Sequence, residues 1–245
     1  MAYGDLFGHG KESFLKVKIQ FLFTAGLPEG WEVPGPHFAP YLAWVNFLAH
    51  LLLSGPRAAP AYSDVLLGNF IADSVPGRQF ESYASAVQTG IRLHRTIDAY
   101  TDQHPIVRRS THRLREAGHG KYAGVISDMF LDHFLARNFP AFSPETLLAF
   151  TQRVYALLTA RQAEMPLRVQ HFLPHLTQHN WLLHYADFDG IASALSGLSR
   201  RATPGSGMET AVTELQKNYG AYEADFREFF PQLEQLVREE LQSET

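Results

Sequence analysis

The chain contains no cysteine, which excludes disulfide bonds, thiolate ligands and a cysteine nucleophile. Any metal ion must therefore be held by nitrogen and oxygen atoms, chiefly those of histidine and carboxylate side chains. Because disulfides are rare in the cytosol, their absence also agrees with a cytoplasmic location, which we expect for this protein.

Long hydrophobic runs and a strong excess of charge of one sign are absent as well. The longest apolar runs, such as WVNFLAHLLL at residues 44–53, are too short to span a bilayer. The segment FLFTAGL at residues 21–27 lacks the length of a signal-peptide core. The formal net charge is −4, so no global feature indicates nucleic acid or an anionic membrane, and we predict neither as a partner.

No pair of segments alternates between apolar and polar residues as paired strands do. Apolar residues instead recur three and four positions apart, as on one face of a helix, in the ranges 41–53, 64–73, 83–102, 122–136, 144–159 and 211–241. Glycine or proline stands in each of the breaks between these segments. With 245 residues and 45% hydrophobic residues, we predict a single-domain, all-α helical bundle over residues 45–245.

Titratable side chains interrupt these apolar helices. Residues four apart lie one turn above each other, so three pairs share helix faces: His94 with Asp98, Asp98 with Asp102, and Asp128 with Asp132. His50 and Asp73 add an imidazole and a carboxylate to two other apolar segments. Helices packed side by side can bring such pairs together around a divalent cation.

Ion pairing is the alternative interpretation, since Asp98 could pair with Arg92 or Arg95 and His94 could be a hydrogen-bonded core histidine. For the set as a whole we favour a metal site, because a buried carboxylate must be paired or ligated. The sequence has no glycine-rich phosphate loop and no nucleophile-elbow serine, so the natural reaction is hydrolysis of a phosphoester by water that a cation activates. Arg92 or Arg95 could hold a phosphate oxygen, and His133 could protonate the leaving group.

The segments that carry these residues resemble the bacterial acyl carrier protein phosphodiesterase family, whose members are also called acyl carrier protein hydrolases. The matching segments follow the order of the family: NFLAHL at 46–51, LLGNFIAD at 66–73, GIRLHRTIDAYTD at 90–102, SDMFLDHFLARNF at 127–139, WLLHY at 181–185 and LSRR at 198–201. The resemblance implies removal of 4'-phosphopantetheine from holo acyl carrier protein to give the apo form. It also implies a divalent cation, Mn²⁺ before Mg²⁺ or Fe²⁺, and an HD-like fold, that of the HD metal phosphohydrolases.

The signature of the HD superfamily includes an adjacent His-Asp pair, and this dipeptide does not occur in the sequence. The site residues are therefore taken from the motifs of the family and not from that signature. We expect metal ligands at His50, Asp73, His94, Asp98 and Asp132. We expect catalytic roles for His133, Arg95 and Asp128.

Members of the family begin with methionine directly before the NFLAHL motif, where this chain has Val45. Because a valine codon can serve as a start, residues 1–44 are interpreted as a misplaced gene start, with a true extension as the alternative. Proline and glycine crowd together in LPEGWEVPGPHFAP at residues 27–40, so this part is expected to lack regular structure.

A basic stretch could bind the acidic acyl carrier protein that the resemblance implies as substrate. Between residues 78 and 121, eight basic side chains stand against four acidic ones. We expect the partner to bind at Arg108, Arg109, Arg113 and Arg115, on a helix that follows the TDQHP turn. A solvated basic face without a partner is the alternative.

Two other functions stay open from the sequence. One is an HD-like phosphohydrolase that acts on a nucleotide or another small phosphoester. The other is a non-catalytic helical adaptor that binds an acidic partner and has lost its metal.

Overall fold

The computed structural model describes residues 46–202 and 204–243, and within these ranges it contains helices and no strand. The longer elements are α2 (Phe47–Leu52), α3 (Tyr62–Ile71), α4 (Ser85–Gln103), α5 (Pro105–Leu114), α6 (Ala123–Arg137), α7 (Leu147–Ala160), α8 (Leu167–Gln178), α9 (Trp181–His184), α10 (Phe188–Arg201), α11 (Ala211–Lys217) and α12 (Tyr219–Ser243). The prediction of an all-α domain is confirmed. The predictions for residues 1–44 lie outside the described ranges.

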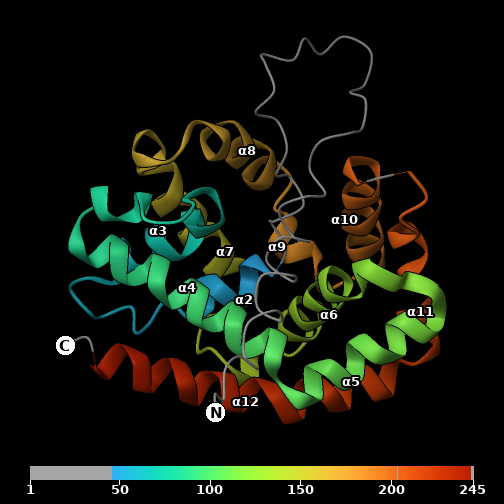
Figure 1. The fold of residues 1–245 in the computed structure, drawn as a ribbon. Coiled ribbons are helices and arrows are strands. Elements are labelled where there is room, and N and C mark those ends of the chain that lie inside the picture. Colours follow the sequence, from blue (N-terminus) through green and yellow to red (C-terminus); the bar gives the residue numbers. More distant parts are fainter. Residues whose placement is uncertain (1–45, 203, 244–245) are drawn as a thin grey trace, which may run out of the picture.

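The short helix α2 lies at the centre of the fold and contacts α3 and α6 (Figure 1). Five of its six residues are buried, among them His50. The other four belong to one hydrophobic cluster that includes residues of α3, α4, α6 and α12. The long helix α12 runs along one side of the molecule and contacts α4, α5 and α6 (Figure 1). A single hydrophobic core therefore surrounds the helix that carries His50.

Helices α3 and α4 approach each other so closely that only glycine fits at their crossing. A Cβ atom on Gly68 would lie 2.0 Å from the main-chain oxygen of Val87, and one on Gly90 would lie 2.1 Å from that of Val65. These distances are far below van der Waals contact, so the two helices pack backbone against backbone. As a consequence, side chains of α4 that face α3 can reach its main chain.

Helices α8 and α10 were not among the segments that we predicted from periodicity. Helix α8 contains Pro174, a residue that normally breaks or kinks a helix interior. Helix α10 has a glycine and serine content that weakens its helical propensity. The segment 211–241, which we predicted as one helix, is divided at Asn218 into α11 and α12. Over the described ranges, no helix combines the length and apolar character that crossing a bilayer requires.

Candidate active site

Two imidazoles and two carboxylates from three elements meet beside α2. His50 comes from α2, His94 and Asp98 come from α4, and Asp73 comes from a short 3₁₀ helix, Ala72–Ser74, that continues α3. Asp98 lies between the rings, with one oxygen 3.3 Å from His50 Nε2 and the other 3.5 Å from His94 Nε2. Asp73 Oδ1 lies 3.4 Å from His94 Nε2. The structure thus brings together four of the five predicted ligands, which we call the imidazole–carboxylate group.

The chemistry of this group fits a divalent cation. Both Nε2 atoms are buried, and neither has a hydrogen-bond partner. Ligand atoms of His50, His94 and Asp98 all lie within 4.8 Å of one another. Donor atoms held about 2.1 Å from one ion in tetrahedral or octahedral geometry lie about 3.0–3.4 Å apart. The observed separations between the Nε2 atoms and the carboxylate oxygens are close to that spacing. An ion at the Nε2 edges of the two stacked rings could therefore bind both nitrogen atoms and a carboxylate.

The pKa values of the two imidazole rings shift in opposite directions. Their centroids are 3.9 Å apart in a stacked arrangement, so two positive charges there would repel each other. Burial lowers the pKa of His50, and the nearby His94 lowers it further. Burial also lowers the pKa of His94, but Asp98 and Asp73 outweigh this effect and raise the pKa to about 10. A cation that bound here would have to displace a proton from His94, and its binding would become stronger as pH rises.

Asn69 on α3 contacts the Nδ1 atom of both imidazole rings. Its side-chain oxygen lies 2.9 Å from His50 Nδ1, and its main-chain oxygen lies 2.8 Å from His94 Nδ1. The side chain is completely buried, and its Nδ2 donates to the main-chain oxygen of His50 at 2.7 Å. Sequence reasoning missed Asn69, although a buried amide within the apolar segment LLGNFIAD is an unusual feature that could have drawn attention to it.

Two arginines hold the turn that carries Asp73. Arg95 donates to the main-chain oxygens of Val75 at 2.8 Å and Gly77 at 3.0 Å. Arg168 of α8 donates to Ser74 Oγ at 2.7 Å and also to the main-chain oxygen of Asp73. Arg95 was predicted to bind phosphate, but its guanidinium instead fixes the segment after Asp73. Nothing in the sequence around Arg168 indicated its place beside this turn.

Asp132, the fifth predicted ligand, has a different position from the one we expected. Its two oxygens each accept a hydrogen bond of 2.9 Å, from the main-chain N–H groups of Leu48 and Ala49. Burial raises the pKa of this carboxyl to about 7, and the two N–H groups oppose the shift. Asp132 therefore caps the first turn of α2, through the N–H groups of the two residues that precede His50.

His133 and Asp128, which were predicted to act in catalysis, lie on α6 with Asp132. His133 Nδ1 lies 2.8 Å from the main-chain oxygen of Tyr185, and Nε2 lies 3.3 Å from the hydroxyl of Tyr219. Its ring also stacks on Phe188. These contacts are with the main chain of Tyr185 and with aromatic side chains, and none is with the imidazole–carboxylate group. Burial lowers the pKa of His133. Asp128 is buried one helical turn before Asp132. It does not belong to the cluster of possible ligands formed by His50, His94 and Asp98.

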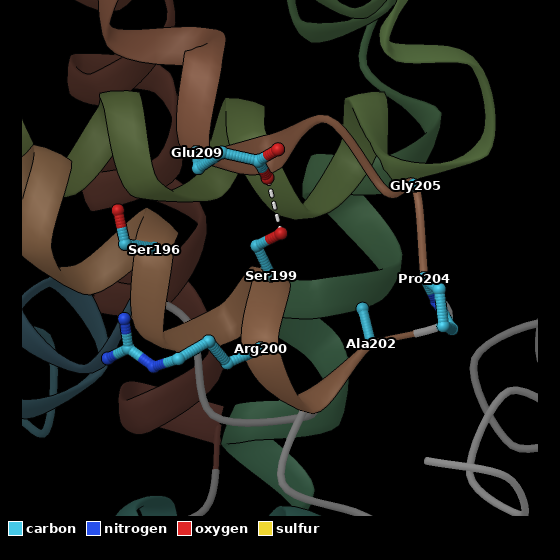
Figure 2. A pocket seen from close by; sticks show the side chains of 7 residues that line it. All are labelled: Ser196, Ser199, Arg200, Ala202, Pro204, Gly205 and Glu209. Atoms are coloured by element: carbon cyan, nitrogen blue, oxygen red, sulfur yellow. Dashed lines mark hydrogen bonds between the residues drawn. The ribbon is translucent and has the colours of Figure 1, made fainter. Parts of the chain in front are cut away.

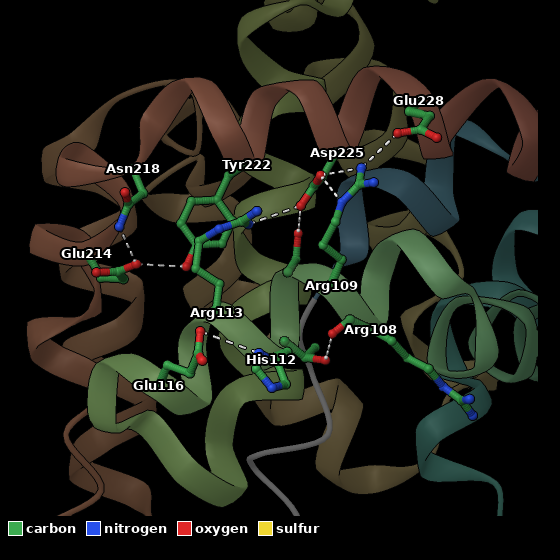
Figure 3. Close-up of polar contacts among 12 residues, drawn as sticks. Arg108, Arg109, His112, Arg113, Glu116, Glu214, Asn218, Tyr222, Asp225 and Glu228 are labelled. Atoms are coloured by element: carbon green, nitrogen blue, oxygen red, sulfur yellow. Dashed lines mark hydrogen bonds and ion pairs between the residues drawn. The ribbon is translucent and has the colours of Figure 1, made fainter.

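The arginines of the predicted partner surface divide into two pairs, and Figure 3 shows three of the four: Arg108, Arg109 and Arg113. Arg109 and Arg113 both bind Asp225 of α12, whose side chain is only 5% exposed, with contacts of 2.8 and 3.0 Å. These two arginines therefore join α5 to α12, and the side chain of Arg109 is still 49% exposed. Arg108 is exposed and points away from Asp225. Arg115 is also exposed, and it donates to the hydroxyl of Thr111.

A surface pocket of about 540 Å³ lies between α10 and the segment that follows it (Figure 2). This volume is in the range of small-molecule sites, but its lining consists of Ser196, Ser199, Arg200, Ala202, Pro204, Gly205 and Glu209. No residue of the imidazole–carboxylate group takes part. The hydroxyl of Ser199 donates to Glu209 across the pocket, so two of its polar groups already satisfy each other.

The fold and the site define a class: an all-α protein with a buried imidazole–carboxylate group suited to a divalent cation. Residues 45–233 match the family model described as acyl carrier protein phosphodiesterase. The chain therefore belongs to the acyl carrier protein phosphodiesterase family, as its motifs indicated. No solved structure shows a significant match to the chain.

Curated relatives cover most of the chain. It is 34% identical to the acyl carrier protein phosphodiesterase of Photorhabdus laumondii, over 76% of this chain and 92% of that protein. The protein of the same name from Serratia proteamaculans is 32% identical, over 80% and 98%. That from an Escherichia coli strain is 33% identical, over 80% and 100%. These relatives confirm the prediction that the chain is an enzyme of this family.

Proposed function

We propose that the chain is a metal-dependent phosphodiester hydrolase that removes 4'-phosphopantetheine from holo acyl carrier protein to give the apo form. The observation that carries this proposal is the pair of buried Nε2 atoms without hydrogen-bond partners, which face two carboxylates at the spacing of ligands around one ion. The names of the curated relatives supply the substrate class.

His50, His94, Asp98 and Asp73 are the residues that would hold the cation. Nitrogen and oxygen ligands of this kind suit Mn²⁺, with Mg²⁺ or Fe²⁺ as alternatives. When bound, such a cation lowers the pKa of water toward neutrality and shields the charge of a phosphate oxygen. The chain contributes the orientation of its own ligands: Asn69 holds both rings, Asp132 caps the helix of His50, and Arg95 and Arg168 fix the turn of Asp73.

The relationship to HD metal phosphohydrolases is part of the same proposal. The support is chemical, because histidines and aspartates from neighbouring helices converge although the sequence has no His-Asp dipeptide. In place of that dipeptide, the segment IAD brings Asp73 alone, and His94 comes from the next helix.

The acidic substrate protein would meet the exposed basic side chains of α5. Arg108 of α5 and Arg115, which directly follows α5, stay in this proposed surface, because both side chains are exposed and neither binds Asp225. Arg109 and Arg113 leave it, because their guanidinium groups bind Asp225. Charge at such a surface raises the rate of association with an acidic partner, and salt weakens the effect.

Intact-mass spectrometry of holo acyl carrier protein tests the proposal. Incubation with the chain and Mn²⁺ should remove the mass of the phosphopantetheine arm, and omission of the cation should prevent the change. Asp98→Asn should abolish the reaction, whereas Asp102→Asn, an exposed position one turn further along α4, should react like the unmodified chain. Hydrolysis of a small nitrophenyl phosphodiester without any change in the carrier protein would favour the small-phosphoester alternative. Inactivity toward both substrates would favour the adaptor.

A further inference from the structure

We propose that Asn69 is a positioning residue that sets the tautomer of both site histidines, so that each presents the lone pair of Nε2 to a bound cation. The two histidines are held by different parts of Asn69. The side-chain oxygen contacts Nδ1 of His50, and the main-chain oxygen contacts Nδ1 of His94. This inference rests on the proposed cation site, but its central contact can be measured without a cation.

The hydrogen-bond network leaves one assignment of donors and acceptors at His50. The main-chain oxygen of His50 can only accept, so the Asn69 atom 2.7 Å from it must be the amide nitrogen. The other end of that amide, the oxygen, must then face His50 Nδ1 at 2.9 Å. An amide oxygen can only accept, so Nδ1 carries the proton and donates it. In the neutral ring the lone pair is consequently on Nε2, the atom 3.3 Å from Asp98.

The same reasoning applies more directly to His94. Its Nδ1 lies 2.8 Å from the main-chain oxygen of Asn69, which accepts and cannot donate. Nδ1 is therefore protonated, and Nε2 is the atom that faces Asp73 and Asp98. The close crossing of α3 and α4 at Gly68 and Gly90 makes this contact to the main chain possible.

Ser54 provides a second anchor for the Asn69 amide and a matched control. Asn69 Nδ2 donates to Ser54 Oγ at 3.2 Å, and Ser54 Oγ donates to the main-chain oxygen of His50 at 2.9 Å. Both Ser54 and Asn69 are buried, so each substitution removes polar groups from the same network. Only Asn69 contacts an imidazole nitrogen.

Because a side-chain atom holds His50 and a main-chain atom holds His94, a substitution of Asn69 should affect the two histidines differently. Asn69→Leu keeps the approximate size and removes the acceptor for His50 but leaves the main-chain acceptor for His94. In the proton NMR spectrum of the metal-free protein, the hydrogen-bonded Nδ1–H signal of His50 should disappear, and that of His94 should persist. Mn²⁺ affinity, measured by electron paramagnetic resonance, should fall about 10- to 100-fold, as for other residues that orient metal ligands.

Two further variants complete the test. Asn69→Asp keeps an acceptor for His50 Nδ1, so the His50 signal should be retained even where the lost amide N–H lowers stability. Ser54→Ala should keep both signals and the Mn²⁺ affinity of the unmodified chain. If Asn69→Leu fails to fold, Asn69→Asp still tests the proposal, because loss of the His50 signal there would contradict it.

Other outcomes are equally decisive. Retention of the His50 signal and of full Mn²⁺ affinity in Asn69→Leu would overturn the proposal. An equal loss of affinity in Asn69→Leu and Ser54→Ala would also overturn it, since the network would then act only through stability. If the unmodified chain binds no Mn²⁺, the proposed function fails, while the NMR signals still show whether Asn69 sets the tautomer of His50.

Discussion

Replacement of Gly90 by alanine should disturb both the packing of α3 against α4 and the cation site. The new Cβ would lie 2.1 Å from the main-chain oxygen of Val65, 2.8 Å from the nitrogen of Asn69 and 2.9 Å from the Cα of Gly68. Ordinary contact begins at 3.4 Å, so the helices would have to move apart by more than an ångström. These neighbours are all main-chain atoms, which cannot rotate out of the way.

Overpacking of a core typically costs about 1–3 kcal/mol, and three main-chain clashes place Gly90→Ala near about 3 kcal/mol. For a domain of this size, that corresponds to a decrease in Tm of about 6–12 °C. The 2.8 Å contact between Asn69 and His94 should lengthen as the helices separate, so Mn²⁺ affinity should fall as well. Calorimetry and electron paramagnetic resonance measure the two effects.

Gly124→Ala is the matched control. Gly124 lies in α6, and a Cβ there would meet no atom within 4 Å. Alanine in an open helical position should be neutral or raise the free energy of unfolding by about 0.4–1 kcal/mol. If Gly90→Ala and Gly124→Ala have the same Tm and the same Mn²⁺ affinity, the glycine crossing does not position His94, and this part of the account is wrong.

Two further predictions concern the free energy of unfolding and the buried carboxylates Asp132 and Asp225. The pKa of Asp132 is raised in the folded state to about 7, so its contribution to stability is complete below its unfolded pKa of about 3.9 and is lost as pH rises through about 7. Asp132→Asn should therefore flatten the fall of unfolding free energy with pH over this window, and an unchanged slope in urea titrations would contradict the assignment. Asp225→Ala leaves Arg109, Arg113 and Ser110 without their shared acceptor and should lower the free energy of unfolding by about 3 kcal/mol. Its kcat should be unchanged where the protein is folded, and an unaltered Tm would refute the anchoring role of Asp225.

Helix periodicity together with the family motifs predicted much of the site. The spacing of His94 and Asp98 on one helix face, and the family motifs around His50 and Asp73, placed these four among the five expected ligands. The structure brings the four side chains together. Asp132 shares the same sequence features, because it is also an aspartate on an apolar helix. Its partners are main-chain N–H groups 83 and 84 residues away, and no local pattern distinguishes a capping carboxylate from a ligand.

The remaining contacts depend on how distant segments pack. Arg109 and Arg113 formed a basic stretch in the sequence, but Asp225, which binds them, is more than a hundred residues further along the chain. Asn69 was missed because an amide is an uncommon ligand and its effect depends on the crossing of α3 and α4. That crossing requires Gly68 and Gly90, and the sequence does not indicate that these two glycines pack against each other.

The measurement that tests the central claim most directly is the binding of Mn²⁺ to purified chain by electron paramagnetic resonance. We expect the unmodified chain and Asp102→Asn to bind the ion with equal affinity, and His94→Gln to bind it at least about 10-fold more weakly. Full affinity in His94→Gln, or no binding by the unmodified chain, would contradict the claim that the imidazole–carboxylate group is a cation site.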